Sequence, residues 1–72
     1  MIDAYIGFCL RGWNWHYNRN GDTWRFNANH VRNTTYRVGL VTHHSKWTMA
    51  RRAVQQVRIL NREIYLAEKT VL

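Results

Sequence analysis

A chain of 72 residues allows one small domain, and at this size roughly 60% of the unfolded surface is buried, so a single core must stabilise it. Eleven Lys and Arg residues stand against four Asp and Glu, a formal net charge of +7. This balance favours a polyanionic partner, and the shortage of carboxylates argues against general acid–base catalysis.

The first ten residues, and the placement of Cys, Pro and Gly along the chain, limit the class of protein. Cys9 is the only cysteine, so no internal disulfide forms and a reducing, cytoplasmic location is expected. The apolar run from Ile2 stops at Arg11, too short for a membrane span, and it fits either an added strand or a short helix. With no Pro and four scattered Gly, nothing marks a linker, and we expect a single domain over residues 1–72. Because the apolar run is short, we also expect no signal peptide and no membrane partner.

Residues 13–28 predict a β-hairpin. Apolar residues alternate with polar ones on both sides of Asn20-Gly21, a dipeptide typical of type I′ turns. If these two residues form the turn, the expected cross-strand pairs share one apolar face: Tyr17 with Trp24, Trp15 with Phe26, and Trp13 with Ala28.

A third strand is expected at Tyr36–Thr42, where a three-residue loop at Arg32–Thr34 would pair Ala28 with Val38 on the same face. Ser45 is a good N-cap for a helix that begins at Lys46. The helical apolar residues fall within one arc: Met49, Ala50, Ala53, Val54, Val57, Leu60 and Ile64. Ile59 points outward. These elements predict an α+β fold, a three-stranded antiparallel sheet packed against one C-terminal α-helix.

The opposite face of this sheet is the candidate binding surface. Asn is suited to bidentate contact with adenine and Arg with guanine, and an antiparallel sheet can enter the major groove. Asn has low strand propensity, so a function would explain its repeated use here. The candidate DNA-binding residues are Asn14, His16, Asn18, Arg25, Asn27, Asn29 and Arg37, with Arg11, Arg19 and Arg32 near the edges and turns.

The helix adds a second basic stripe. Arg51, Arg58 and Arg62 would point away from the sheet's polar face and are interpreted as a solvated surface. Arg52 and Lys46, nearer the helix start, are candidates for a phosphate contact beside the sheet, because a helix N-terminus favours anions.

The pattern resembles a known family, the APETALA-type ethylene-response-factor DNA-binding domain, and its relatives at the arm-binding end of lambda-type integrases and beside phage homing nucleases. The resemblance is carried by Gly12 to His16, Trp24, Tyr36 to Val41, and the Ala-containing helix after Ser45. It implies three antiparallel strands on one helix, binding the major groove through the sheet. Asn14 and Asn18 stand where that family usually places Arg, so its sequence preference does not transfer.

Other functions have weaker support in the sequence. The four His and Cys9 match no recognised metal-ligand spacing, and no catalytic constellation can be assembled, so we expect no enzyme, no metal and no cofactor. A DNA-binding protein of this kind could come from a phage or mobile element. The main alternative is a small virus or mobile-element protein that binds and inhibits a host protein or ribonucleoprotein, since Trp, Tyr and Arg also form protein hot spots. RNA stacking would be favoured if Trp13 or Tyr17 faced outward.

Overall fold

A hairpin of two eight-residue strands, β1 (Trp13–Asn20) and β2 (Thr23–His30), forms one side of the sheet in the computed structural model, which describes residues 1–70. Asn20 pairs with Thr23, so Gly21-Asp22 form the two-residue turn. The expected turn at Asn20-Gly21 was therefore wrong by one position. Gly21 has φ +63°, whereas Asp22, like every other non-glycine residue within 1–70, does not have a positive φ. A type II′ turn has this pattern, because only its first central residue, a glycine, has positive φ.

The corrected register preserves the predicted faces, because moving a turn by one residue shifts the pairing by two. Trp15 now lies opposite Ala28, and Tyr17 lies opposite Phe26. The indole of Trp15 lies toward α1, with its Cζ2 3.9 Å from the position that a Cβ would take at Gly7.

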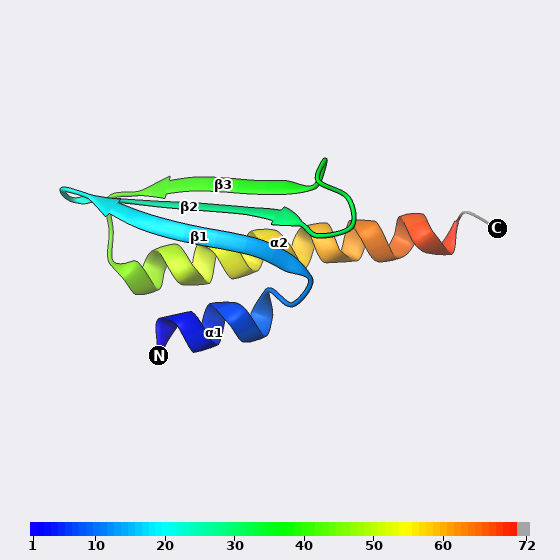
Figure 1. Ribbon diagram of the computed structural model, residues 1–72, viewed down its shortest axis with the longest axis horizontal. Helices are drawn as coiled ribbons and strands as arrows, with labels where there is room; N and C mark the ends of the chain where they lie inside the picture. The colour runs from blue at the N-terminus through cyan, green and yellow to red at the C-terminus, as the bar shows by residue number, and fades with distance from the viewer. Residues whose placement is uncertain (71–72) are drawn as a thin grey trace.

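Strand β3 (Arg37–Thr42) pairs antiparallel with β2, giving the strand order β1-β2-β3. Ala28 pairs with Val38, as the sequence predicted. Beyond the strand ends, the His30 N–H donates to the carbonyl of Tyr36 and the Tyr36 N–H donates to the carbonyl of Asn33, which closes the connecting loop. The three strands lie side by side as one twisted layer (Figure 1).

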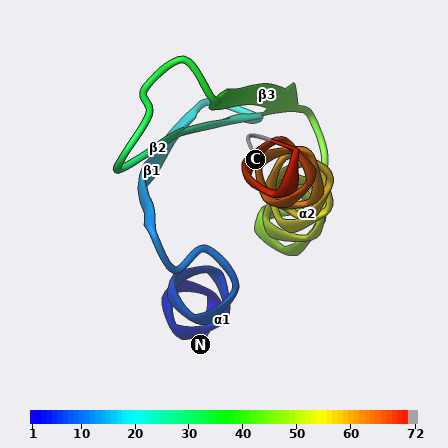
Figure 2. The same ribbon diagram turned by 90° about the vertical axis from the view of Figure 1, so that its right-hand side faces the viewer.

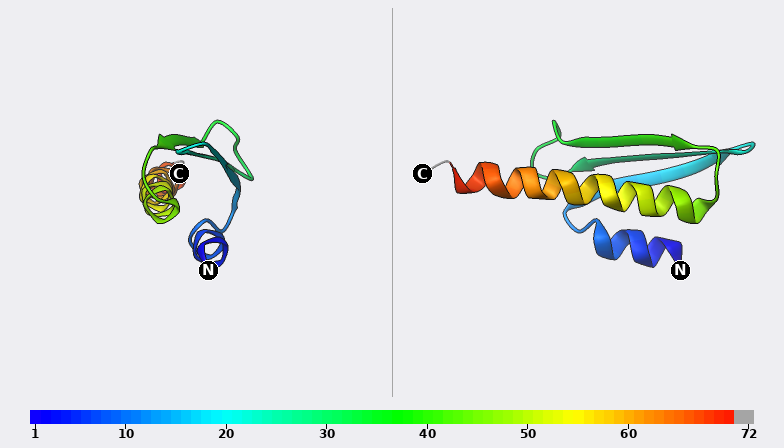
Figure 3. Two further views of the ribbon diagram at one scale, coloured as in Figure 1. Left: turned by 90° about the vertical axis from the view of Figure 1, so that its left-hand side faces the viewer. Right: turned by 180° about the vertical axis from the view of Figure 1, so that it is seen from behind.

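Helix α2 (Lys46–Lys69) begins where the capping pattern predicted, since the hydroxyl of Ser45 accepts a hydrogen bond from the N–H of Thr48. The predicted arc faces the sheet: five of its residues are buried and Leu60 and Ile64 are half-buried against the core. Ile59 is 58% exposed, also as predicted. The last turns of α2 extend beyond the strands (Figures 1 and 3).

Residues 2–9 form a second helix, α1 (Ile2–Cys9), which decides between the strand and the helix that the sequence left open. Both helices lie on the same side of the sheet (Figure 2). Ile6 and Leu10 are fully buried and Cys9 is half-buried. Gly12, with φ +85°, turns the chain from α1 into β1.

The core lies between the inner face of the sheet and the two helices. Its fully buried side chains come from every layer: Phe26, Ile6, Leu10, Met49, Val54 and Val57. Ala50 and Ala53 are also fully buried and let the α2 backbone approach the large aromatic residues of the hairpin. The predicted sheet on a C-terminal helix is therefore confirmed, with α1 as an added element.

Candidate nucleic-acid interface

The side of the sheet that faces away from both helices carries polar side chains in three cross-strand rows. We call this side the outer face. Its rows are Asn14–Asn29–Arg37, His16–Asn27–Gly39 and Asn18–Arg25–Val41. All seven candidate residues predicted within strands thus lie together, and six are exposed while Asn29 is half-buried.

The polar groups of the outer face are free to bind a ligand. None of the side-chain hydrogen bonds formed within residues 1–70 involves any of the seven side chains. Each Asn offers one acceptor oxygen and two N–H donors, and each Arg offers five donors. Two arginines, four asparagines and one histidine therefore present unused hydrogen-bonding capacity on one surface.

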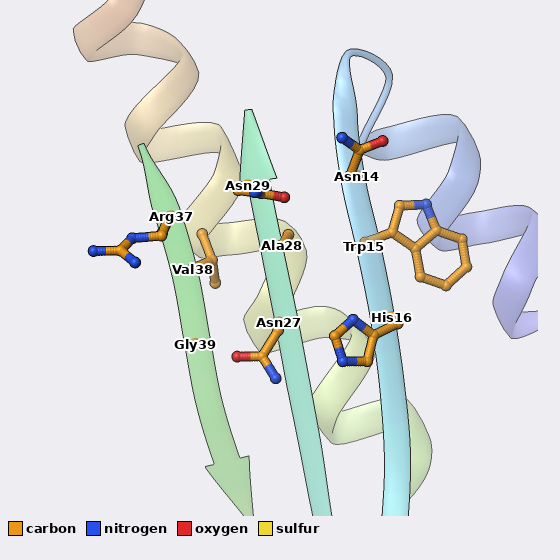
Figure 4. A pocket seen from close by; sticks show the side chains of 9 residues that line it. All are labelled: Asn14, Trp15, His16, Asn27, Ala28, Asn29, Arg37, Val38 and Gly39. Atoms are coloured by element: carbon orange, nitrogen blue, oxygen red, sulfur yellow. The ribbon is translucent and has the colours of Figure 1, made fainter. Parts of the chain in front are cut away.

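The middle of the outer face is hollow. A depression of about 490 Å³ is lined by the first two rows and their neighbours Trp15, Ala28 and Val38. Figure 4 shows Asn14, His16, Asn27 and Asn29 along β1 and β2, with Arg37 directed past the edge of β3. A second depression of about 280 Å³ continues it between Arg25 and Val41. Gly39 lines both hollows, because it contributes no side chain to fill them.

The three arginines predicted at edges and turns do not join this surface closely. The guanidinium of Arg11 lies over the ring of Phe8 at 4.8 Å, on the α1 side of the chain. Arg19 donates from Nε to the carbonyl of Gly21 at 2.7 Å and lies over the ring of Trp24 at 5.9 Å. Arg32 is exposed in the β2–β3 loop. They surround the outer face at its two ends.

Lys46 has a different position from the one expected for a phosphate contact. Its Nζ lies 4.9 Å from the ring centroid of Tyr17 and 5.7 Å from that of Trp24, both on the inner face. Such cation–π contacts hold the start of α2 against the hairpin. Arg51, Arg58 and Arg62 are exposed on α2, the layer that covers the inner face, so they lie across the core from the outer face.

Positive charge on the outer face is not neutralised within the described chain. Among residues 1–70 no Lys or Arg lies within 4.0 Å of a carboxylate oxygen. Asp3 is on α1, Asp22 is in the hairpin turn, and Glu63 and Glu68 are near the end of α2. No acidic residue belongs to the three rows, so the local field favours an anion.

Two residues of the outer face escaped the sequence interpretation, which considered only polar side chains. Gly39 and Val41 follow Arg37 at two-residue spacing, so strand alternation alone would have placed them on this face. Val41 is 49% exposed and lies opposite Arg25. Apolar side chains in such positions contact the methyl group of thymine in the major groove.

Trp13, Tyr17 and His30 take part in packing within the described fold. Trp13 is buried and Tyr17 half-buried on the inner face, which removes the condition for RNA stacking on these two rings. His30 packs against the rings of Trp13 and Tyr36. Within residues 1–70 no three His, Cys, Asp or Glu side chains gather as a metal site, and neither helix has the length and apolarity of a membrane span.

Comparisons with protein-family models, curated proteins and solved structures find no match to this chain.

Proposed function

We propose that the chain binds duplex DNA through the outer face of its sheet and that its role is recognition without catalysis. The observation that carries the proposal is the gathering of Asn and Arg side chains in three rows on one exposed surface. Within residues 1–70 these side chains have no hydrogen-bond partners, and no acidic residue belongs to the rows. Adenine and guanine present in the major groove the donor and acceptor patterns that these two side chains complement.

The dimensions of the sheet agree with this groove. Three strands span two inter-strand spacings, about 10 Å, whereas the major groove is about 12 Å wide. The helices lie on the opposite side and leave the outer face uncovered (Figure 2). A duplex can therefore approach the rows without displacing any element of the fold.

The test is selection from a random duplex pool by the full chain, followed by affinity measurements on the enriched sequence at several salt concentrations. If about four arginines contact phosphates, log Kobs should fall with log salt concentration with a slope of about −3.6. Enrichment of a sequence together with such a slope supports the proposal. Binding of equal strength to every duplex, or no binding, rejects recognition by the rows.

A second candidate function, binding and inhibition of a host protein or ribonucleoprotein by a small virus or mobile-element protein, is favoured by one observation. Apolar side chains are exposed on and beside the two helices: Phe8 of α1 is 68% exposed and Met1 before it 97%, while Trp47 at the start of α2 is 40% exposed and packs against Tyr5 with ring centroids 5.7 Å apart. Large exposed apolar side chains are typical of protein interaction sites.

The two functions use different surfaces, so one pair of variants separates them. Phe8→Ser should reduce binding to a protein partner and leave duplex affinity unchanged. Arg25→Ala should do the reverse, because Arg25 lies on the outer face of the sheet. Loss of duplex affinity in Phe8→Ser, with Arg25→Ala unaffected, would assign nucleic-acid binding to α1 and contradict the proposal for the outer face.

A further inference from the structure

Gly39 occupies the centre of β3 although its backbone does not require glycine. Within residues 1–70 the only glycines with positive φ are Gly12 and Gly21, so Gly39 has an ordinary extended backbone. Glycine weakens the interior of a strand because it loses more conformational freedom than other residues and adds no side chain to pack. The reason for glycine at this position must lie in the space above it.

That space borders the side chain of Asn27. Asn27 and Gly39 are cross-strand partners. The backbone hydrogen bond between His30 and Tyr36 sets the alternation along the ladder, which makes Asn27–Gly39 a non-hydrogen-bonded pair, the kind in which side chains lie closest. A Cβ built on Gly39 would lie 3.4 Å from the Oδ1 of Asn27, and Figure 4 shows the Asn27 oxygen directed toward β3.

The two depressions of the outer face meet at the same pair. Asn27 and Gly39 line both the larger hollow, toward Asn14 and Arg37, and the smaller one, toward Arg25 and Val41. A side chain on residue 39 would project between the hollows. The amide of Asn27 is thus the central hydrogen-bonding group of the face, and open space surrounds it on the β3 side.

We infer that Asn27 recognises an adenine in the major groove and that Gly39 is the positioning residue that allows it to do so. The Oδ1 of Asn27 accepts a hydrogen bond from the adenine N6 amino group, while its Nδ2 donates to N7. Gly39 keeps clear the space beside the amide, into which the base edge enters. The inference rests on the proposed function and names a base that the outer face selects.

The test uses the duplex selected by the full chain and two substitutions, Asn27→Ala and Gly39→Val, alone and together. Each single variant should weaken binding to the selected duplex by about 5- to 150-fold, the range of one bidentate base contact. If Gly39 acts through Asn27, the double variant should bind about as weakly as the weaker single variant. Thr42→Val, which adds the same side chain to the inner face of the same strand, should bind like the wild type.

A folding defect is distinguished from a binding defect by thermal unfolding. Val has high strand propensity, so Gly39→Val should unfold at or above the wild-type temperature while its affinity falls. A chemical probe completes the test: replacing the selected adenine by 7-deazaadenine removes the N7 acceptor. The wild type should lose affinity for this duplex, whereas Asn27→Ala should bind modified and unmodified duplexes equally.

The outcomes separate the inference from the proposed function. If the wild type selects no sequence, both fail. If it selects a sequence but Gly39→Val binds normally, or the losses from Asn27→Ala and Gly39→Val multiply in the double variant, Gly39 does not position Asn27 and the inference is overturned while recognition by the sheet stands. The inference is also overturned if the selected site contains no adenine, or if replacing its adenines by 7-deazaadenine leaves the affinity of the wild type unchanged.

Discussion

The indole Nε1 of Trp13 donates a hydrogen bond of 3.0 Å to the Oδ1 of Asn61, joining the first residue of β1 to the middle of α2, 48 positions away in sequence. Trp13 is buried, so its N–H has lost access to water and depends on this acceptor. The contact orients one end of the sheet on the long helix.

Asn61→Ala is therefore expected to lower the free energy of unfolding by about 1 kcal/mol, or roughly 4–8 °C in Tm, although alanine is the better helix former. Urea or thermal unfolding measures the change. In a Trp13→Phe background, which lacks the N–H donor, Asn61→Ala should no longer destabilise. An equal loss in both backgrounds would show that Asn61 acts through something other than the indole.

Thr42 presents the opposite situation, a buried hydroxyl that lacks a partner among the described residues. The residue is 2% exposed, and its Oγ1 forms no hydrogen bond within residues 1–70. Thr42→Val keeps the shape and removes the polar group, so it should raise the free energy of unfolding by about 1 kcal/mol. The matched control is Thr23→Val, because the hydroxyl of Thr23 lies 3.3 Å from Nδ1 of His43. If Thr23→Val raised the free energy of unfolding as much as Thr42→Val, this explanation would be contradicted.

Gly12 is required by its backbone. Its φ of +85° is unfavourable for any residue with a Cβ, and no atom lies within 4 Å of the position that a Cβ would take, so the cost is purely conformational. Gly12→Ala should destabilise by about 1–2 kcal/mol in thermal unfolding. Gly7→Ala, inside α1 and 3.9 Å from Trp15, should be neutral or stabilising. If Gly7→Ala destabilised the protein and Gly12→Ala did not, this explanation of Gly12 would be wrong.

Lys46 tests whether a basic residue near the sheet serves stability or binding. Its ammonium group is half-buried over Tyr17 and Trp24, so Lys46→Gln should lower the free energy of unfolding by about 0.5–1 kcal/mol. Duplex affinity should change less than in Arg25→Ala. A variant with normal Tm and weakened DNA binding would instead support the phosphate contact that its place at the helix start suggested.

Periodicity predicted most of the fold because it depends on burial alone. The alternation in residues 13–28 and the apolar arc of α2 both indicate which side chains face the core. The predicted assignment of side chains to the two faces of the sheet was therefore correct, even though the turn was misplaced by one residue. The turn itself depended on the competition between two glycine-containing dipeptides, which sequence spacing does not resolve. For α1, Ile2 and Ile6 are buried but Phe8 is exposed, and so short a segment carries too few positions to distinguish a helix from a strand.

The candidate site was predictable to the same extent and for the same reason. Strand alternation placed the seven polar residues on one face, whereas contacts between elements could not be obtained from it. The cation–π contacts of Lys46, the attachment of Arg19 to the turn and the space that Gly39 leaves for Asn27 all depend on the register and on the position of α2. Long-range geometry decides which of several basic residues remain available to a ligand.

Two arginines on opposite sides of the molecule give the most direct test of the DNA-binding face. Arg25 lies in the third row of the outer face, and Arg62 is exposed on α2. Both substitutions by alanine remove one charge. Arg25→Ala should weaken the selected duplex by about 1–3 kcal/mol more than an unrelated duplex, because a base contact is lost along with the charge.

Arg62→Ala should reduce all affinities slightly and equally, since at 0.1 M salt a charge acts over only about 10 Å. Arg11→Ala and Arg32→Ala, at the ends of the sheet, are expected to weaken every duplex alike and to make the salt slope shallower. Arg19→Ala should act mainly on hairpin stability, because its guanidinium is held by Gly21 and Trp24. Equal losses from Arg25→Ala on selected and unrelated duplexes would reduce the outer face to an electrostatic surface without base recognition.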